Sequence, residues 1–297
     1  MRAALLAGLL LVLPHTALAQ LSGKLVSTGS DTLAGLSSLW AQSMMRLHPE
    51  ATVQVRALGS SAAPTALIEG TADIGPMSRP MTASEAARFQ RRFGYPPTAV
   101  PVAVDTVAVF VHRDNPLRAI GRNELDAIFS ANRRCGAPRG IQHWGELGLV
   151  DAWEDRPISS YGRGAASGTY GYVRAELLCG GDYAPRVNRL VGSAAVVRSV
   201  GSDLAGIGYS SAGFLSDSVQ RLRVLGTDGA VAPMLSRDLI LYVNRPPGEP
   251  LAPLLRAYLR AALDEAGQHQ VQAAGYEALD SERRDALWRE LDLGALQ

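Results

Sequence analysis

Short alternating apolar runs are followed along this chain by segments in which apolar residues recur every three or four positions. The first such segment carries these recurring positions: Leu33, Leu36, Leu39, Trp40 and Met44. This spacing predicts an amphipathic helix with one buried face. A turn of small polar residues, "GSDT" (29–32), directly precedes it and follows a short apolar run. The pattern therefore predicts a strand, a turn and a helix in that order.

Two later segments repeat this order. Residues 53–55 alternate as a strand and residues 59–61 form a turn, after which a short helix turns three side chains inward: Ala63, Leu67 and Ile68. The glycine-rich stretch "YGRGAASGTYGY" (161–172) precedes a helix whose apolar face comprises Val173, Leu177 and Leu178. Glycine allows a ligand to approach the main chain in such a turn.

The rest of the chain continues the alternation. The run "AVPVAVDTVAVFVH" (99–112) predicts a long strand. The C-terminal segment predicts amphipathic helices with the inner face Leu254, Leu255, Tyr258, Leu259 and Leu263. We expect this face to pack on the core, although a partner-binding helix is an alternative. Alternating strands and helices predict the α/β fold class.

The N-terminus has the pattern of a secretory signal peptide. Arg2 precedes an apolar run (3–13), and small residues end the segment at Ala19. We expect residues 1–19 to be removed by cleavage after Ala19, and the protein to be periplasmic. The apolar run is shorter than the roughly 20 residues that span a bilayer. No cysteine follows the cleavage site, so a lipid anchor is not expected.

Composition and charge narrow the classes of function. The formal net charge is +1, and nothing indicates a nucleic-acid partner. Lys24 is the only lysine, which excludes a phosphate-loop nucleotide site and a Schiff-base enzyme. The five histidines lie far apart without ligand spacing, so we expect no metal and no cofactor.

Cys135 and Cys179 are the only cysteines. Export would place them in an oxidising compartment, where an even pair tends to close, so we predict a disulfide. Two buried thiols are the alternative.

The three polar turns suggest an anion site. The first amides of a helix have no partner within the helix, and Arg163 adds a planar cation beside one of these turns. Serine and threonine are also the ordinary N-caps of helices, and this alternative explains most single occurrences. Three such turns without a lysine, histidine or metal cluster favour anion binding without catalysis.

Several segments resemble the periplasmic phosphate-binding proteins of phosphate ABC transporters. They are "GSDTL" (29–33), "GSSAAPTALIEGTADIGPMSRPM" (59–81), "YGRGAASGTYGYV" (161–173), "AGIGYSS" (205–211), "NPLRAIGRNELDAIFS" (115–130) and "WGELGL" (144–149), and the likeness covers nearly all of the mature chain. The resemblance implies a type II periplasmic binding protein fold, with two α/β lobes, a hinge of two crossovers and the ligand cleft between the lobes. It implies a first lobe of residues 20–105 and 214–297, a second of 106–213, and hinge candidates at 104–107 and 208–211. It also implies inorganic phosphate as ligand, an inner-membrane ABC transporter permease as partner, and a monomer.

The family's phosphate-binding positions fall on three groups of residues here. They are Ser30, Asp31, Thr32 and Leu33 in the first turn, Ser60 with Ser61 as neighbour in the second, and Arg163, Ser167, Gly168 and Thr169 in the third. The Arg163 side chain and the exposed backbone of the third turn would then bind two sides of one tetrahedral dianion.

The sequence departs from the family at one position. Members often carry an aspartate that accepts the phosphate proton and so excludes sulfate, but Pro76 and Ser78 occupy the corresponding region here. Asp31 is our candidate acceptor, and a helix-capping role is the alternative. Ser78 and Arg79 are candidates for supporting positions outside the ligand contacts. We expect no ligand role for Asp73 or Asp105, which could be hinge or core hydrogen-bonding residues.

Three other functions remain open. A site of this kind could take another oxyanion, namely sulfate, molybdate, arsenate or a phosphonate. A secreted serine hydrolase or phosphatase with Ser60 or Ser167 as nucleophile would need a nearby base, and neither serine lies in a nucleophile motif, so we expect no enzyme. The third is an adhesion or signalling protein that uses the same lobes without transport.

Overall fold

The computed structural model describes residues 21–226, 229–232 and 235–294, so the predicted signal peptide lies outside the described residues. A mixed sheet has the strand order β2-β1-β3-β11-β4-β8-β6-β7, with β9 beside β4. Its strands are β1 (Gly23–Thr28), β2 (Ala51–Arg56), β3 (Ile74–Met77), β4 (Thr98–His112), β6 (Ser159–Arg163), β7 (Asn188–Leu190), β8 (Gly206–Ser211), β9 (Val219–Arg221) and β11 (Leu235–Val243). A parallel pair is formed by β5 (Ala119–Gly121) and β10 (Arg223–Leu225).

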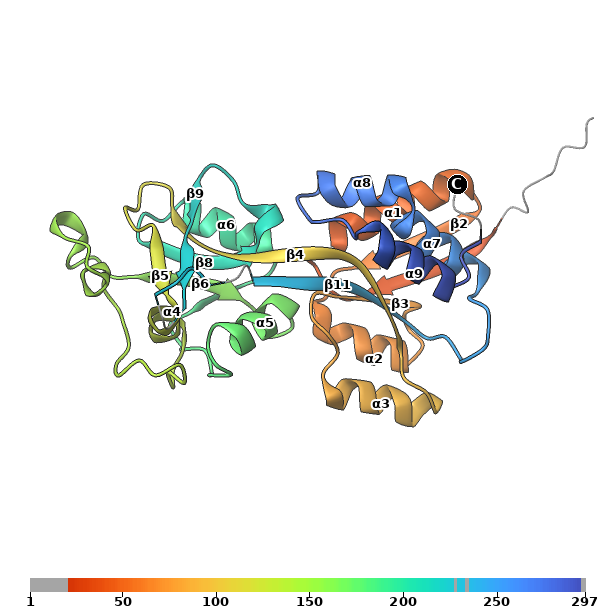
Figure 1. The fold of residues 1–297 in the computed structure, drawn as a ribbon, viewed down its shortest axis with the longest axis horizontal. Helices are drawn as coiled ribbons and strands as arrows, with labels where there is room; N and C mark the ends of the chain where they lie inside the picture. Colours follow the sequence, from red (N-terminus) through yellow and green to blue (C-terminus); the bar gives the residue numbers. More distant parts are fainter. Residues whose placement is uncertain (1–20, 227–228, 233–234, 295–297) are drawn as a thin grey trace, which may run out of the picture.

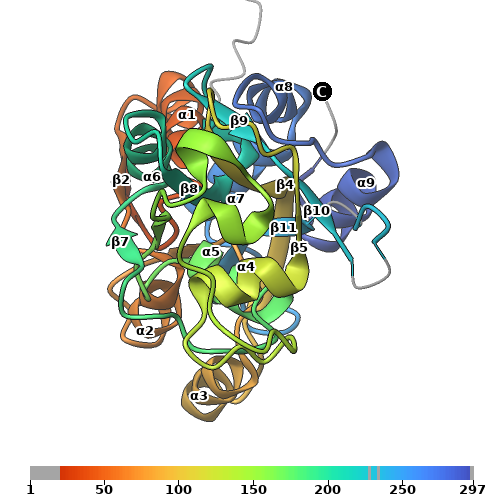
Figure 2. The same cartoon turned by 90° about the vertical axis from the view of Figure 1, so that its left-hand side faces the viewer.

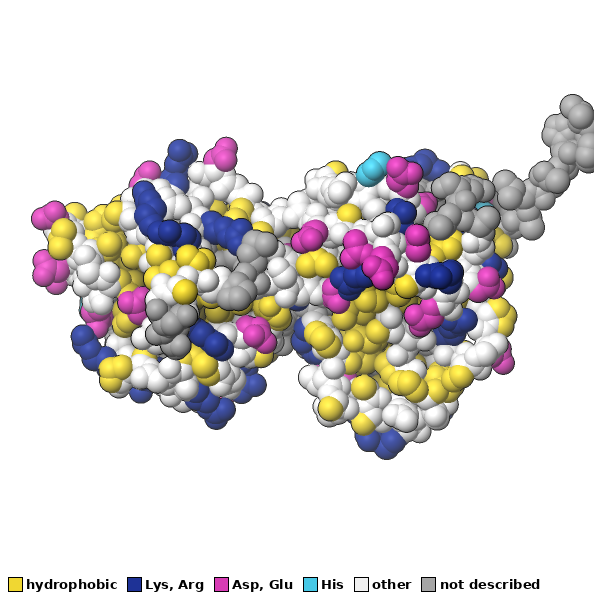
Figure 3. All heavy atoms as spheres, in the orientation of Figure 1, with side chains coloured by type: hydrophobic (Ala, Val, Ile, Leu, Met, Phe, Trp, Pro, Cys, Tyr) yellow, Lys and Arg dark blue, Asp and Glu magenta, His cyan; other side chains and the backbone are white. Residues whose placement is uncertain are grey.

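The molecule has two lobes joined by β4 and β11, which pass from one lobe to the other (Figure 1). Figure 3 shows the molecule narrowing between them. The helices of the first lobe are α1 (Ala34–Leu47), α2 (Ala63–Ile68), α3 (Ala83–Phe93), α7 (Pro253–Leu263), α8 (Glu265–Ala273) and α9 (Ser281–Glu290). Those of the second are α4 (Arg122–Phe129), α5 (Gly168–Glu176) and α6 (Ser193–Gly201). Short 3-10 turns are η1 (Ser60–Ala62), η2 (Trp144–Leu147), η3 (Asp151–Trp153) and η4 (Ala212–Phe214).

Side chains that alternate along the strands build a hydrophobic core on each face of the sheet. In β11, Leu239, Leu241 and Val243 pack in the core with α1, α7, α8 and α9, whereas Ile240 and Tyr242 pack with α2 and α3. The C-terminal half of β4 alternates in the same way in the second lobe. Residues 107, 109 and 111 pack in the core with α4 and α5, and residues 108 and 110 pack with α6. Helices therefore cover both faces of one sheet, as the α/β prediction requires.

The predicted inner faces of the helices are largely confirmed. In α7, Leu255, Tyr258, Leu259 and Leu263 are buried in the first-lobe core, and Leu254 packs against its edge. The face predicted for the first helix is buried at residues 33, 36, 40 and 44, but the prediction is wrong at residue 39, a leucine that is 38% exposed. Residue 39 lies at the edge of the apolar face of α1, beyond the part that the core covers.

The second crossover differs from the expected one. The first hinge candidate, residues 104–107, lies within β4 where that strand pairs with β11. The second candidate, 208–211, lies instead in β8, which pairs with β4 and β6 inside the second lobe. The chain then touches the first-lobe core at Phe214 but turns back. Strands β9 and β10 pair with β4 and β5 (Figure 2), so the return to the first lobe takes place at β11 rather than at residue 214.

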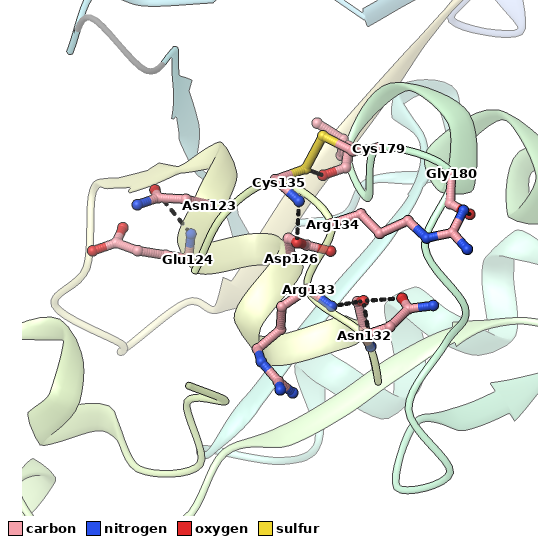
Figure 4. Close-up of a disulfide and its surroundings, with 11 residues drawn as sticks. Asn123, Glu124, Asp126, Asn132, Arg133, Arg134, Cys135, Cys179 and Gly180 are labelled. Atoms are coloured by element: carbon pink, nitrogen blue, oxygen red, sulfur yellow. Dashed lines mark hydrogen bonds between the residues drawn. A yellow bond between two sulfur atoms is a disulfide. The ribbon is translucent and has the colours of Figure 1, made fainter. Parts of the chain in front are cut away.

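A disulfide joins Cys135 and Cys179, as predicted. It links the loop after α4 to the turn after α5, with a Cα–Cα distance of 5.4 Å (Figure 4). Asp126 of α4 accepts a hydrogen bond from the Cys135 amide at 2.7 Å, and Arg134 donates to the Gly180 carbonyl at 3.3 Å. These contacts hold both ends of the bridge in the second lobe.

Removing this bridge is expected to lower the free energy of unfolding by about 2 to 4 kcal/mol, because it closes a loop across 44 positions and restricts the unfolded chain. Thermal unfolding with and without dithiothreitol measures the effect. The Cys135→Ala/Cys179→Ala variant is the control, and its melting temperature should not respond to reductant. Equal melting temperatures for the oxidised and reduced wild type would contradict the prediction.

Candidate anion-binding site between the lobes

The turn after β1 brings two buried hydroxyls to the end of that strand. The Ser30 amide donates to the Pro76 carbonyl at 2.7 Å, which holds the turn against β3. The side chains of Ser30 and Thr32 are buried, and their hydroxyl oxygens have no hydrogen-bond partner in the described part of the chain. Leu33 is the N-cap of α1, and no side chain caps that helix. An uncapped helix start beside two unpartnered hydroxyls is rich in donors for an anion.

Asp31 and Arg163 join the first and third turns across the two lobes. Arg163 Nη2 donates to Asp31 Oδ2 at 2.5 Å, so Asp31 makes this contact instead of capping α1. Arg163 Nη1 donates to Ser193 Oγ at 2.7 Å, and its backbone amide donates to the Tyr209 hydroxyl at 3.2 Å. Burial raises the pKa of Tyr209 to about 12, which keeps the phenol neutral. Only Nε of this buried guanidinium has no partner among the described residues.

The second turn contributes Ser60 and Ser78. Ser60 is fully buried, and its Oγ accepts the Ser78 amide at 3.1 Å and lies 3.3 Å from Ser78 Oγ. The Ser61 amide donates to the Ala166 carbonyl at 3.1 Å, which is a hydrogen bond between the two lobes. The structure thus places Ser78 beside Ser60, while Ser61 contacts the facing turn through its backbone.

Arg79 lies outside this group and supports the turn. Both of its terminal nitrogens donate to Glu85 at 2.8 Å, and Nη2 also donates to Ser61 Oγ at 3.2 Å. Burial opposes ionisation of Glu85, but hydrogen bonds from Arg79 and from the Thr82 amide outweigh it and hold the pKa of Glu85 below its usual value. Arg79 is therefore neutralised by its own partner.

The third turn leads directly into α5. Ser167 is the N-cap of this helix, and its Oγ accepts the Thr169 amide at 3.1 Å, so the capping alternative describes this hydroxyl. Thr169 is fully buried, and its Oγ1 accepts a hydrogen bond from Arg237 Nη2 at 2.8 Å. Arg237 is a residue that the sequence analysis did not single out.

Glycine at position 168 allows the second and third turns to meet. A Cβ atom there would lie 2.4 Å from both Ser60 Oγ and Ser78 Oγ. A similar close approach occurs at Gly59, where a Cβ atom would lie 2.5 Å from the Ala166 carbonyl oxygen. The backbones of the two lobes therefore touch at the site.

Two further residues, Asp105 and Arg237, reach the site from the crossover strands. They are opposite each other on β4 and β11, and Arg237 donates from Nε and Nη2 to Asp105 Oδ2 at 3.0 and 2.7 Å. Ser211 Oγ donates to the other carboxylate oxygen at 2.5 Å. The expectation that Asp105 is a hinge or core hydrogen-bonding residue agrees with these contacts. One signal was present in the sequence: an aspartate inside a buried strand requires a partner.

The assembled group suits a small anion. Buried hydroxyls and two guanidinium groups converge from both lobes, and an aspartate neutralises each arginine. A cavity of about 90 Å³ opens beside them and is lined in part by Asp31, Arg163 and Ser167. Each arginine is thus paired with a carboxylate, so directed hydrogen bonds would provide most of the selectivity.

The hydroxyl contacts of the two candidate nucleophiles, Ser60 and Ser167, can be compared with the base that a hydrolase needs. In the described ranges the side-chain hydroxyls of Ser60 and Ser167 bond to Ser78 and to the Thr169 amide, and these contacts include neither a histidine nor a carboxylate. Within those ranges no cluster of three or more histidine, cysteine or acidic side chains could hold a metal ion. No helix there has both the length and the apolar character needed to cross a bilayer.

Comparison with known proteins places the chain among binding proteins. A family model described as a PBP superfamily domain matches residues 14–265. The phosphate-binding protein PstS of Pseudomonas aeruginosa is 45% identical over 284 residues, which cover 92% of this chain and 88% of that protein.

Two solved structures share the fold. One, from Clostridium perfringens with bound phosphate, has a TM-score of 0.71 at 22% identity and covers 87% of this chain and 100% of its own. The other, an ABC-type phosphate transport receptor from Vibrio cholerae, has a TM-score of 0.66 at 22% identity and covers 86% and 100%. The predicted two-lobed fold class is therefore confirmed.

Proposed function

The chain belongs to the PstS phosphate-binding proteins of the PBP superfamily, and on that premise we propose that it captures inorganic phosphate between its lobes for an ABC transporter. One observation of the structure supports this most directly. The buried donors Ser30 Oγ, Thr32 Oγ1 and Arg163 Nε have no partner among the residues that the structure describes. They come from both lobes and belong to the turns that the family resemblance singled out. An oxyanion that accepted from all of them would bridge the lobes and favour the closed arrangement.

The proposed ligand contacts are those expected from the sequence. They are Ser30, Asp31, Thr32, Leu33, Ser60, Ser61, Arg163, Ser167, Gly168 and Thr169, with Ser78 and Arg79 in supporting positions. We assign Ser78 the closer support, because it bonds to Ser60, and Arg79 the more distant one, because it pairs with Glu85.

Calorimetric titration of anion-stripped protein with phosphate at neutral pH tests the proposal. We expect tight binding with one phosphate per chain and no displacement by a large excess of sulfate. Sulfate binding that equals or exceeds phosphate binding would instead assign the site to another oxyanion, which the serine at position 78 in place of a carboxylate makes the second candidate.

Replacing Asp31 by asparagine should weaken the discrimination against sulfate by about tenfold to a hundredfold, the range for a hydrogen bond to a charged group. The physical reason is that Asp31 would accept the phosphate proton, whereas it would repel an oxyanion that carries none. Asparagine can still accept from Arg163 through its amide oxygen. The measurement is the ratio of phosphate to sulfate affinity.

Asp73→Asn is the matched control, because the Asp73 carboxylate accepts from the Val26 amide in the first lobe and not from a site residue. An unchanged ratio in the Asp31→Asn variant would exclude Asp31 as the acceptor and leave phosphate binding itself intact as a proposal.

The remaining parts of the proposal concern the setting. We infer export by a signal peptide cleaved after Ala19, a periplasmic monomer that carries no catalytic activity, and delivery of phosphate to a membrane permease that recognises the closed lobes. The two lobes would turn about β4 and β11. Mass spectrometry of the protein from the periplasmic fraction checks the cleavage, since the mature chain should begin at Gln20.

A further inference from the structure

Arg237 has more contacts than a structural ion pair needs. Its side chain is 2% exposed, and that of its partner Asp105 is 1% exposed. Besides the two donors to Asp105, Nη2 donates to Thr169 Oγ1 at 2.8 Å, and the guanidinium lies 5.2 Å from the centre of the Tyr172 ring. Its Nη1 is buried without a partner in the described part of the chain. The cation therefore connects both crossover strands to the first turn of α5.

Stability alone does not account for this arrangement. Desolvating two charges costs several kcal/mol, and well-packed apolar residues are often as stable as a buried ion pair or more so. Arg237 and Asp105 are surrounded by the apolar alternation of β4 and β11, where apolar residues would be the ordinary choice. A function for the pair at the site is the better physical explanation.

We propose that Arg237 is a positioning residue that makes the Thr169 hydroxyl a hydrogen-bond donor to the bound anion. A threonine hydroxyl has one proton and two lone pairs, and its proton rotates to suit its neighbours. Because Arg237 occupies a lone pair of Oγ1, the hydroxyl proton points away from the guanidinium. Thr169 then donates to the ligand and does not compete with it as an acceptor. This assignment rests on the proposed function and extends it to a residue outside the three turns.

The same contacts connect ligand binding to the hinge. Asp105 and Arg237 face each other at the point where β4 and β11 pass between the lobes, and Ser211 at the end of β8 donates to Asp105. Thr169 is thereby held in place by both crossover strands and not only by its own helix. Rotation about these strands would move Thr169 relative to the turns of the first lobe, so anion contact and lobe closure depend on one buried group.

A double-mutant cycle on phosphate affinity tests the proposal. Arg237→Met would leave Asp105 buried without its cation, so the working background is Arg237→Met/Asp105→Asn, in which the asparagine can still accept from Ser211. We expect this pair to weaken phosphate binding by about tenfold to a hundredfold, the range for charge-assisted hydrogen bonds. Thr169→Val should then reduce phosphate affinity by a factor that is at least about fivefold smaller in this background than in wild type. The reason is that the two residues act through one hydroxyl.

Two further variants separate positioning from structure. Ser30→Ala removes a donor of the first lobe that has no bond to Arg237, and its cost should be the same in wild type and in the Arg237→Met/Asp105→Asn background. Arg237→Lys keeps a charge for Asp105 but loses the fork that reaches Thr169 as well. We expect it to retain the melting temperature while lowering phosphate affinity by about tenfold.

The outcomes are distinguishable from those for the function itself. The cycle is run with phosphate and, in parallel, with sulfate. Equal costs of Thr169→Val in both backgrounds, with the wild type binding phosphate, would overturn the role of Arg237 alone. Coupling seen with sulfate but no phosphate binding would overturn the ligand assignment and support Arg237. A wild-type protein that binds neither anion would overturn both.

Discussion

Phosphate affinity is expected to fall by about a hundredfold to a thousandfold when Arg163 is replaced by methionine. Removing one partner of a buried, hydrogen-bonded charge pair typically costs 2 to 5 kcal/mol or more, and here the same guanidinium also carries the donor Nε. Arg163 bonds to Asp31 in the first lobe and to Ser193 in the second, so its loss also removes a contact between the lobes. Isothermal titration of purified variants with phosphate measures the effect.

Two controls isolate the contribution of the guanidinium. Asp31→Asn/Arg163→Met removes the carboxylate that the single substitution leaves unpaired, and its melting temperature should return towards that of wild type. Arg163→Lys keeps the charge without the planar fork, and we expect it to recover only part of the affinity. Wild-type affinity in a folded Arg163→Met variant would remove Arg163 from the site.

Replacing Gly168 by alanine is expected to weaken phosphate binding by about tenfold to a hundredfold by opposing closure. The added methyl group would lie 2.4 Å from the hydroxyl oxygens of Ser60 and Ser78, and Ser60 is fully buried. Turning Ser60 away would break its bond with the Ser78 amide, and overpacking of this kind typically costs 1 to 3 kcal/mol. Titration calorimetry gives the affinity, and small-angle scattering with and without phosphate reports whether the lobes still close.

Gly164→Ala is the matched control in the same turn. A Cβ atom at Gly164 would meet no atom of the described residues within 4 Å, so this variant should bind and close as wild type does. If Gly168→Ala keeps full affinity and the same change in scattering, the lobes do not approach each other in solution as they do in this structure.

Both predictions follow from how the site is divided between the lobes. Ser30, Asp31 and Ser60 come from the first lobe, whereas Arg163 and Thr169 come from the second. The ion pair between Asp31 and Arg163 joins the two halves of the site. An anion that bridges the same two lobes adds to this contact, which is how binding would favour closure.

Local pattern was sufficient to predict the elements on which the site is built. Each of the three turns carries small polar residues and lies between a strand and a helix in the structure, because side-chain period and turn chemistry act over a few neighbouring residues. The disulfide was predictable for a different reason, because its cysteines lie 44 positions apart but are the only two in the chain and so permit one pairing. The inner face of α7 followed from its spacing alone.

Pairing between distant strands was beyond the reach of local pattern. Strands β9 and β10 were assigned to the first lobe from a boundary at residue 214, yet they pair with β4 and β5. A strand of three residues is too short to show a clear alternation of apolar and polar positions. Its pairing depends on which strand edge is available in the folded protein. The second crossover therefore lies at β11, and not at residue 214 as the resemblance implied.

The sequence by itself determined the α/β class, most of the helix faces and the three polar turns, because each depends on residues close together in the chain. It also determined the cysteine pair, because the chain has two cysteines and they permit one pairing. Only the tertiary structure decided that Asp31 pairs with Arg163, that Gly168 lies against Ser60 and Ser78, and that Arg237 joins Asp105 to Thr169. Those contacts join residues far apart in sequence. They arise because β4 and β11 join the two lobes and bring their turns together. The periodicity of the sequence does not show which buried charges then form pairs.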